Sequence, residues 1–139
     1  MKYYVVADVH GFCSILKDSL KEKGFFNDEE PHKLIVCGDL FDRGGEAVEL
    51  QNFILELLEK DEVILIKGNH EELLVDMLNS WHRASYLESH HNSNGTVDTI
   101  LQLTSSRLAD LYDNPSDVYY KMKETPFMQK ILPAMVDYF

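Results

Sequence analysis

Three short apolar runs, separated by amphipathic stretches, do most to constrain the fold of this 139-residue chain. The runs cover residues 3–7, 33–37 and 63–66 and are rich in β-prone side chains, which is typical of buried strands. Between them, residues 13–23 and 46–60 repeat apolar side chains at helical spacing. Strands that alternate with helices predict an α/β fold, built from βαβ units with a parallel sheet covered on at least one face.

After residue 70 the sequence predicts helices and no convincing strand. Residues 71–81 and 96–103 place apolar side chains at helical spacing, and a turn is expected at residues 92–95. Pro115 and Pro126 each stand where the first residue of a further helix is expected. The inward side chains of the helix over 96–103 are expected to be Val97, Ile100 and Leu101.

The length suits one domain, residues 1–139, with a substantial core. Within it we expect a βαβαβ core over residues 1–72 and a helical lid or appendage over residues 73–139. The chain carries 13 Lys and Arg against 24 Asp and Glu, a net charge of −11. This charge repels phosphate backbones and anionic lipid, so nucleic acids and membranes are not the expected partners.

Two further features predict a cytoplasmic protein. The apolar N-terminal run is interrupted by Asp8, before it reaches the length of a signal peptide, and no apolar run approaches the roughly 18 residues of a spanning helix. Cys13 and Cys37 have no metal-knuckle spacing, and we expect both to be buried free thiols in a reducing compartment.

Polar residues follow each of the three predicted strands. Asp8 and His10 follow the first strand, Asp39 follows the second, and Asn69 follows the third, so that one βα unit separates successive groups. Because the carboxyl ends of parallel strands share one edge of a sheet, these four side chains are expected to surround one point.

Carboxylate, imidazole and amide groups form a mixed oxygen and nitrogen set that suits Mn²⁺, Fe or Zn²⁺. Two converging carboxylates, Asp8 and Asp39, also resist joint ionisation unless a cation lies between them. The alternative is that Asp8 and Asp39 are turn or cap residues and His10 an ordinary loop histidine. That alternative explains any one of them well, but it explains their recurrence at three strand ends poorly.

Three segments resemble the first signature motifs of the calcineurin-like metallophosphoesterases. They are Asp-Val-His-Gly at residues 8–11, Gly-Asp-Leu-Phe-Asp-Arg-Gly at 38–44 and Gly-Asn-His-Glu at 68–71. Each is weak alone, but three in order at this spacing are specific. The pair Arg43-Gly44 and the residue Glu71 resemble the phosphoprotein phosphatase branch, which includes phage-type serine/threonine phosphatases and symmetrical diadenosine tetraphosphatases.

The resemblance implies the N-terminal part of a four-layer αββα sandwich and a site for two divalent metal ions. Asp39 is the implied bridging carboxylate, Asp8 and His10 are implied ligands of the first metal, and Asn69 of the second. In the family, a hydroxide shared by the two metals attacks the phosphorus of a phosphomonoester in line. Mn²⁺ is the expected metal, with Fe or Zn²⁺ as alternatives.

The resemblance also implies roles beside the metals. His70 is similar to the family's acid, and Asp42 is expected to hold its imidazole in one tautomer. Arg43 has the planar fork that binds phosphate oxygens in a bidentate manner, and Asn69 is expected to contact the phosphate as well. Glu71 is expected to cap the following helix rather than take part in catalysis. Three glycines are expected to allow tight turns and close backbone approach: Gly38, Gly44 and Gly68.

The later metal ligands of the family, a strand-end histidine and a Gly-His-x-His segment, have no counterpart in this chain. The other histidines are expected to be solvated residues of helices or loops: His32, His82, His90 and His91. We therefore expect the N-terminal part of a larger phosphatase domain, with the second sheet largely missing. The alternative is a non-catalytic remnant that binds a metal or a phosphate.

The expected partner is a phosphorylated substrate, either a phosphoprotein or a small phosphoester. Dinucleoside tetraphosphates are a further alternative, because the family hydrolyses all three with the same core. Helices within residues 71–103 are expected to roof the site. Arg83 and Arg107 are candidates to reach a phosphate, although such residues are more often simply solvated.

Overall fold

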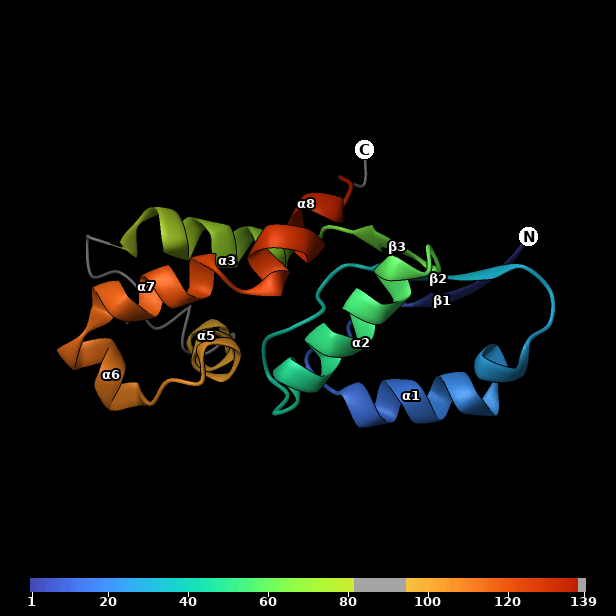
Figure 1. Cartoon of the computed structure of the whole chain (residues 1–139), viewed down its shortest axis with the longest axis horizontal. Coiled ribbons are helices and arrows are strands. Elements are labelled where there is room, and N and C mark those ends of the chain that lie inside the picture. Colours follow the sequence, from blue (N-terminus) through green and yellow to red (C-terminus); the bar gives the residue numbers. More distant parts are fainter. Residues whose placement is uncertain (82–94, 138–139) are drawn as a thin grey trace.

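A computed structural model describes residues 1–81 and 95–137 of the chain (Figure 1). Strands β1 (Lys2–Val6), β2 (His32–Cys37) and β3 (Val63–Ile66) form one parallel sheet in the order β1-β2-β3. The three predicted strands are confirmed, with β1 lying one residue earlier than expected and β2 beginning one residue earlier. The expected α/β fold is therefore present, and the strands of the described residues make this one sheet.

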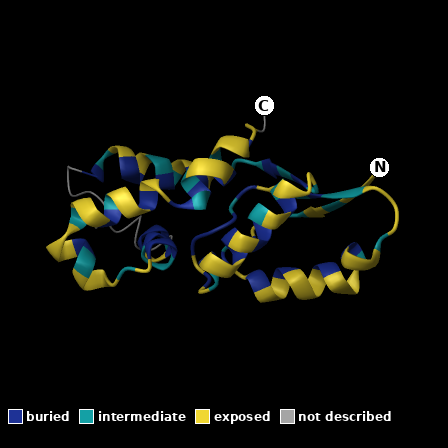
Figure 2. Ribbon diagram, viewed as in Figure 1, coloured by how far each residue is buried: buried dark blue, intermediate teal, exposed yellow. Residues whose placement is uncertain are grey.

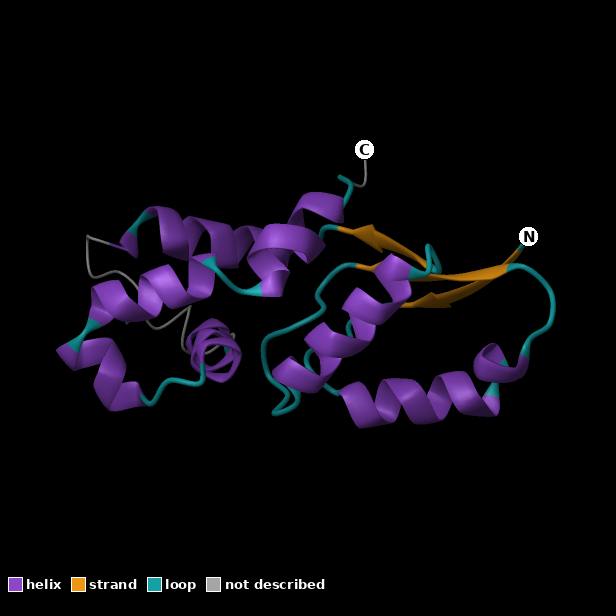
Figure 3. Cartoon of the chain, viewed as in Figure 1, coloured by secondary structure: helices purple, strands orange, loops and turns teal. Residues whose placement is uncertain are grey.

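Two helices connect the strands and cover one face of the sheet. Helix α1 (Cys13–Glu22) is followed by the 3₁₀ turn η1 (Phe25–Asn27), and helix α2 (Ala47–Glu59) leads into β3. Gly24 has a φ of 87°, which confirms the expected helix stop because this conformation favours glycine. Figure 3 shows both helices on the same side of the strands.

The two faces of the sheet differ in burial. Side chains on the face toward α1 and α2 form part of the core, as Leu34, Val36 and Leu65 show, whereas Tyr3 and Val5 on the other face are 52% and 66% exposed. Figure 2 shows the burial class of each residue along the ribbon. Cys37 alternates onto this second face and is exposed, so its predicted burial is wrong. Cys13 is buried as expected, and burial raises the pKa of its thiol.

The described residues after β3 are mainly helical, as predicted. Their helices lie mainly at the end of the molecule away from the N-terminus (Figure 1). The helical elements are α3 (Asn69–Asn79), α5 (Thr96–Thr104), α6 (Leu108–Asp113), α7 (Pro115–Lys123), the π-helical turn η4 (Phe127–Ile131) and α8 (Leu132–Ala134). Pro115 is the first residue of α7 as expected, and Pro126, in helical conformation directly before η4, begins the next helical run as expected.

Several boundaries differ from the sequence-based expectation. Helix α3 begins at Asn69 instead of Glu71 and ends before Trp81, whose indole donates to the Pro115 carbonyl at 2.8 Å. In α5, Val97 and Ile100 are buried as expected, but Leu103 is buried more fully than Leu101. Val136 forms an isolated parallel bridge with Ile66, so some backbone pairing with the sheet does occur after residue 70.

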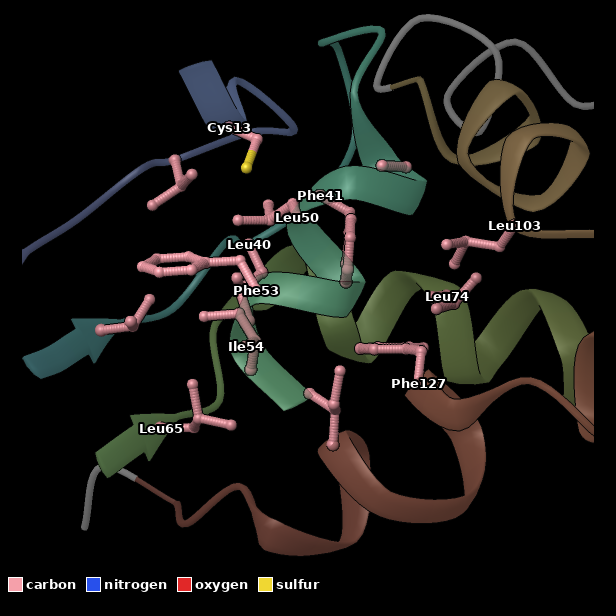
Figure 4. Close-up of a cluster of buried hydrophobic side chains, with 14 of the residues drawn as sticks. Cys13, Leu40, Phe41, Leu50, Phe53, Ile54, Leu65, Leu74, Leu103 and Phe127 are labelled. Atoms are coloured by element: carbon pink, nitrogen blue, oxygen red, sulfur yellow. The ribbon is translucent and has the colours of Figure 1, made fainter. Parts of the chain in front are cut away.

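One apolar core extends through both halves of the chain. Figure 4 shows Phe127 beside Phe41, and their rings meet edge to face at 5.0 Å between centroids. Leu50 and Ile54 of α2 and Leu74 of α3 belong to the same buried cluster. The helical half thus packs directly on the segment that follows β2.

Within the described residues, no helix has the length and apolar character required to cross a membrane.

Candidate metal centre

The carboxyl ends of the strands bring three ligand side chains together. One ligand atom from each of His10, Asp39 and His70 lies within 4.8 Å of the others. Asp8 lies beside this group, with its Oδ1 3.9 Å from His10 Nε2, but its side chain is 70% exposed. The predicted convergence therefore holds for His10 and Asp39, and Asp8 lies at the outer edge.

The imidazole of His10 is held in the orientation that a metal ligand needs. Its Nδ1 lies 2.9 Å from the carbonyl oxygen of Phe41, and because a carbonyl only accepts, Nδ1 carries the proton. Nε2 consequently keeps a free lone pair. This pairing of a ligand imidazole with a backbone acceptor is the usual support for histidine at a metal site.

The carboxylate of Asp39 lies at the start of α3. Its Oδ1 accepts the backbone N–H of His70 at 2.9 Å. The amide group of Asn69 lies against both carboxylate oxygens, and with its nitrogen turned toward them it donates to each at 3.1 Å. In the opposite orientation of the amide, its oxygen would face the Asp39 carboxylate and could join it in holding a cation. These carboxylate, amide and imidazole groups fit a divalent ion of the Mn²⁺, Fe or Zn²⁺ type.

Next to this group lies a buried pair of Asp42 and His70. His70 Nδ1 is 3.0 Å from Asp42 Oδ2, and the two side chains are 6% and 3% exposed. The ring of His70 also packs edge to face on that of His10, with 4.7 Å between centroids. The structure therefore brings together the two residues expected to act as an acid and its support. Arg43 is exposed beside them.

Two hydroxyl groups from α5 complete the surroundings of Asp42. Thr99 Oγ1 donates to Asp42 Oδ1 at 2.6 Å, and Thr96 Oγ1 donates to Oδ2 at 2.9 Å. Sequence reasoning missed both, because threonines in a first helical turn resemble ordinary cap residues. The signal that remains in the sequence is their spacing of three, which places both on one face of a helix.

Glu71 joins two of the loops. Its buried carboxylate accepts the backbone N–H groups of Gly68 at 2.9 Å, Asp39 at 2.9 Å and Leu40 at 3.2 Å. The expected capping role is thus confirmed, and the same side chain also fixes the loop after β2. Burial raises the pKa of Glu71, while the three N–H donors act in the opposite direction.

Backbone strain is concentrated in these loops. Five residues that are not glycine have φ values in the left-handed region: Asp8 (53°), His10 (49°), Asp39 (53°), Asp42 (67°) and Arg43 (106°). Each such conformation costs on the order of 1–3 kcal/mol and persists only where surrounding contacts impose it.

Hydrogen bonds between the loops supply part of that support. The backbone N–H of His10 donates to the Asp39 carbonyl at 3.0 Å, and that of Gly11 donates to Leu40 at 2.8 Å. Gly68 allows the loop after β3 to approach the loop after β2 closely, because a Cβ at Gly68 would lie 2.5 Å from Asp39 Oδ1.

The other candidate residues lie away from the centre or outside the described residues. His32 begins β2, is half-buried and packs against Phe25 at 4.7 Å between centroids, so the expectation of a solvated helix or loop residue is wrong. Arg107 is exposed, which agrees with the expectation that it is solvated, and it pairs with Asp110 at 3.7 Å. Four residues lie outside the described ranges: His82, Arg83, His90 and His91.

Comparisons with known proteins agree with this geometry. The chain is 36% identical over 73 residues to serine/threonine-protein phosphatase 1 of Salmonella typhimurium, which covers 52% of this chain and 31% of that protein. It is also 36% identical over 75 residues to a symmetrical bis(5'-nucleosyl)-tetraphosphatase of Buchnera aphidicola, covering 54% and 26%. An asymmetrical bis(5'-nucleosyl)-tetraphosphatase of Bacillus velezensis is 30% identical over 76 residues, covering 50% and 30%.

These matches span less than a third of the length of the three relatives. The family model described as calcineurin-like phosphoesterase matches residues 1–128, which include every loop of the metal centre and helix α5. The chain therefore belongs to the calcineurin-like phosphoesterase family, a family of metal-dependent hydrolases.

Proposed function

We propose that this chain carries the metal and phosphate site of a phosphoesterase that hydrolyses phosphomonoesters, of the serine/threonine phosphatase type. The observation that carries the proposal is that two expected metal ligands, His10 and Asp39, converge with the expected acid His70: one side-chain nitrogen or oxygen atom of each lies within 4.8 Å of the others. The buried pair of Asp42 and His70 beside it is the second support. A metal-binding group next to a held imidazole suits phosphoryl transfer to water.

In this proposal two divalent ions are held by the strand-end residues. Asp39 would be a ligand of both ions, Asp8 and His10 would hold the first, and Asn69 would hold the second. Mn²⁺ is the proposed ion, and Fe or Zn²⁺ suit the same ligands. When bound, such ions neutralise phosphoryl oxygens and lower the pKa of water.

The protein's own groups then act on the substrate. With Nδ1 of His70 donating to Asp42, the protonated ring can give its Nε2 proton to the leaving alkoxide and return to the neutral imidazole. Arg43 would bind two phosphate oxygens with its planar guanidinium, and Asn69 would contact the phosphate from the loop after β3. Both cysteines are free thiols, which suits the proposed cytoplasmic location.

The test is hydrolysis of p-nitrophenyl phosphate by the purified chain with added Mn²⁺. We expect metal-dependent turnover that Asp39→Asn and His70→Asn both reduce by at least about 100-fold, since each removes a group that acts on the metals or the leaving group. Asp18→Asn, an exposed carboxylate on α1, is the control and keeps wild-type activity. Mn²⁺ binding without turnover would instead favour a non-catalytic metal-binding protein.

A second candidate is hydrolysis of dinucleoside tetraphosphates, because a relative named for that activity matches with the same 36% identity as the serine/threonine-protein phosphatase. Competition between a phosphoserine peptide and diadenosine tetraphosphate distinguishes the two. Preferential release of phosphate from the peptide supports the phosphatase. Preferential cleavage of the tetraphosphate to adenosine nucleotides supports the second candidate.

A further inference from the structure

Helix α5 lies against the loop that carries Asp42 and Arg43. Residues of this loop and of α5 are separated by more than 50 positions in the sequence, yet they share three side-chain hydrogen bonds at Asp42. Thr99 accepts the backbone N–H of Asp42 at 3.0 Å and donates to its Oδ1 at 2.6 Å. One side chain of α5 thus fixes both the backbone and the carboxylate of this aspartate.

The two threonines also fix the plane of the Asp42 carboxylate. Thr99 occupies Oδ1, while Thr96 shares Oδ2 with Nδ1 of His70. All four side chains are at most 6% exposed, so water does not compete for these bonds. A carboxylate held at both oxygens can present Oδ2 to the imidazole in one direction only, which in turn restricts the ring orientation.

A second set of contacts continues along the same face of α5. Gln102 lies one turn after Thr99, and its side chain donates to the Gly44 carbonyl at 3.0 Å and accepts the Ala47 N–H at 2.9 Å. At the start of the helix, a Cβ on Gly95 would lie only 2.6 Å from the backbone nitrogen of Arg43. The helix therefore contacts the loop from Asp42 to its end at α2.

We infer that α5 is the positioning element of the Asp42–His70 pair and of the Arg43 loop, with Thr99 as its main positioning residue. The inference rests on the proposed function, because it assigns α5 to the proposed proton donor and phosphate-binding arginine. The sequence predicts that this helix helps to roof the site. In the inference, α5 instead holds the loop of Asp42 and Arg43 in position. The support also explains how a chain segment at φ values of 67° and 106° keeps its conformation.

The test compares three variants of the full chain. Thr99→Val removes the hydroxyl while keeping the shape, and Thr99→Ser restores it. Thr104→Val is the matched control, because Thr104 is also buried on α5 and, within the described residues, its hydroxyl bonds to Ile100 and Ser106 instead of to the Asp42 loop. Circular dichroism melting checks that each variant is folded, and if Thr99→Val is not, Thr96→Val replaces it.

The first readout needs no metal and no activity. Long-range ¹H–¹⁵N spectra of the metal-free chain report which nitrogen of the His70 ring is protonated and how fast that proton exchanges with water. We expect a slowly exchanging Nδ1 proton in the wild type, Thr99→Ser and Thr104→Val. In Thr99→Val we expect exchange about fivefold faster, as for the loss of one ordinary hydrogen bond. Unchanged exchange in Thr99→Val would overturn the inference.

The second readout is the Mn²⁺-dependent hydrolysis of p-nitrophenyl phosphate. We expect Thr99→Val to lower kcat about fivefold with little change in KM, because the affected group acts on the leaving alkoxide. Thr99→Ser recovers most of the rate. An equal loss in Thr99→Val and Thr104→Val would contradict a positioning role. Absence of turnover in the wild type would refute the proposed function alone, while the spectra would still decide whether α5 holds the pair.

Discussion

The loops at the strand ends and the helical half of this chain are stabilised in different ways. The loops contain five non-glycine residues in the left-handed region, whereas among residues 95–137 Ser105, at a φ of 53°, is the one such residue. Polar contacts between distant segments hold the loops, through Glu71 and the backbone bonds of His10 and Gly11. The helices are held mainly by burial of apolar side chains such as Val118, Met122 and Phe127.

The backbone follows its local conformational preferences in the helices and departs from them in the strand-end loops. Helices of the second half follow apolar periodicity, so local structure and packing agree there. The loops adopt conformations that are locally unfavourable, and those conformations place ligand groups at one point. Substitutions in the helices should therefore change stability, while substitutions of ligand residues in the loops should change binding. Four predictions test this contrast.

The largest effect is expected for Phe127→Ala. Phe127 is fully buried, packs on Phe41 at 5.0 Å and donates its backbone N–H to Gln51 at 2.9 Å. Loss of its ring should lower the free energy of unfolding by about 3–5 kcal/mol. Urea denaturation measures this change. Tyr120→Ala, at an aromatic residue 64% exposed on α7, should change it by less than about 0.5 kcal/mol. Equal losses of unfolding free energy in Phe127→Ala and Tyr120→Ala would contradict the assigned role of apolar burial.

Asp39→Asn should show the opposite behaviour. The asparagine keeps an oxygen to accept the His70 N–H but loses the charge that binds cations. We expect Mn²⁺ affinity to fall by at least about 100-fold, while the free energy of unfolding of the metal-free chain changes by less than about 1 kcal/mol. Isothermal titration with Mn²⁺ and urea denaturation measure the two quantities. A loss of stability larger than that of Phe127→Ala would refute this division of roles.

Glu71→Gln sharpens the contrast, because Glu71 is a carboxylate near the metal centre that we assign to structure. One of its oxygens becomes an amide group that faces N–H donors, which should lower the free energy of unfolding by about 2 kcal/mol. The neighbouring Glu72 is exposed on the same helix, and Glu72→Gln should have almost no effect. Urea denaturation of the pair gives the comparison, and equal midpoints would show that Glu71 does not hold the loops.

The smallest effect concerns a carboxylate far from the site and depends on pH. Tyr4 donates to Asp28 at 2.5 Å and Lys2 pairs with it at 3.1 Å, and these contacts lower the pKa of Asp28 from 3.8 to about 2. A pKa lowered by folding adds stability above the unfolded value, and this stability is lost as pH falls toward the folded value. The advantage of wild type over Asp28→Asn should therefore be complete at pH 5 and shrink between about pH 4 and pH 2.

Urea midpoints of the wild type and Asp28→Asn across that pH range measure the effect. Glu29→Gln, at an exposed neighbour, is the control and should show no such pH dependence. A difference between wild type and Asp28→Asn that stays constant from pH 5 to pH 2 would contradict the assignment.

Much of the fold and part of the site are readable from local patterns. Apolar runs and helical periodicity predict the strands and most helices within two residues, because these patterns report which side chains a regular element buries. The spacing of Asp39 and His10 predicts their convergence, since parallel strands end at one edge of the sheet. Boundaries such as the start of α3 at Asn69 were missed because Glu71 extends the helix by capping Gly68.

Other features depend on contacts that no local pattern reports. The exposure of Cys37 follows from which face of the sheet the helices cover, and the half-burial of His32 follows from its packing on Phe25. The exposed position of Asp8 likewise depends on how the loop after β1 turns. In each case the same residue type in the same local sequence fits either environment, and only the arrangement of distant elements decides between them.

Residue types at short spacing are enough to predict the alternation of strands and helices, and with it the parallel sheet. They are also enough to predict the three motifs and the family to which the motifs point. Only the tertiary structure decided what supports those motifs. Thr96, Thr99 and Gln102 bond to the loop after β2 across more than 50 residues, and their shared helix face does not indicate which distant segment they contact. The physical reason is that a buried hydrogen bond requires two groups to meet in space, and their separation along the chain carries no information about that meeting.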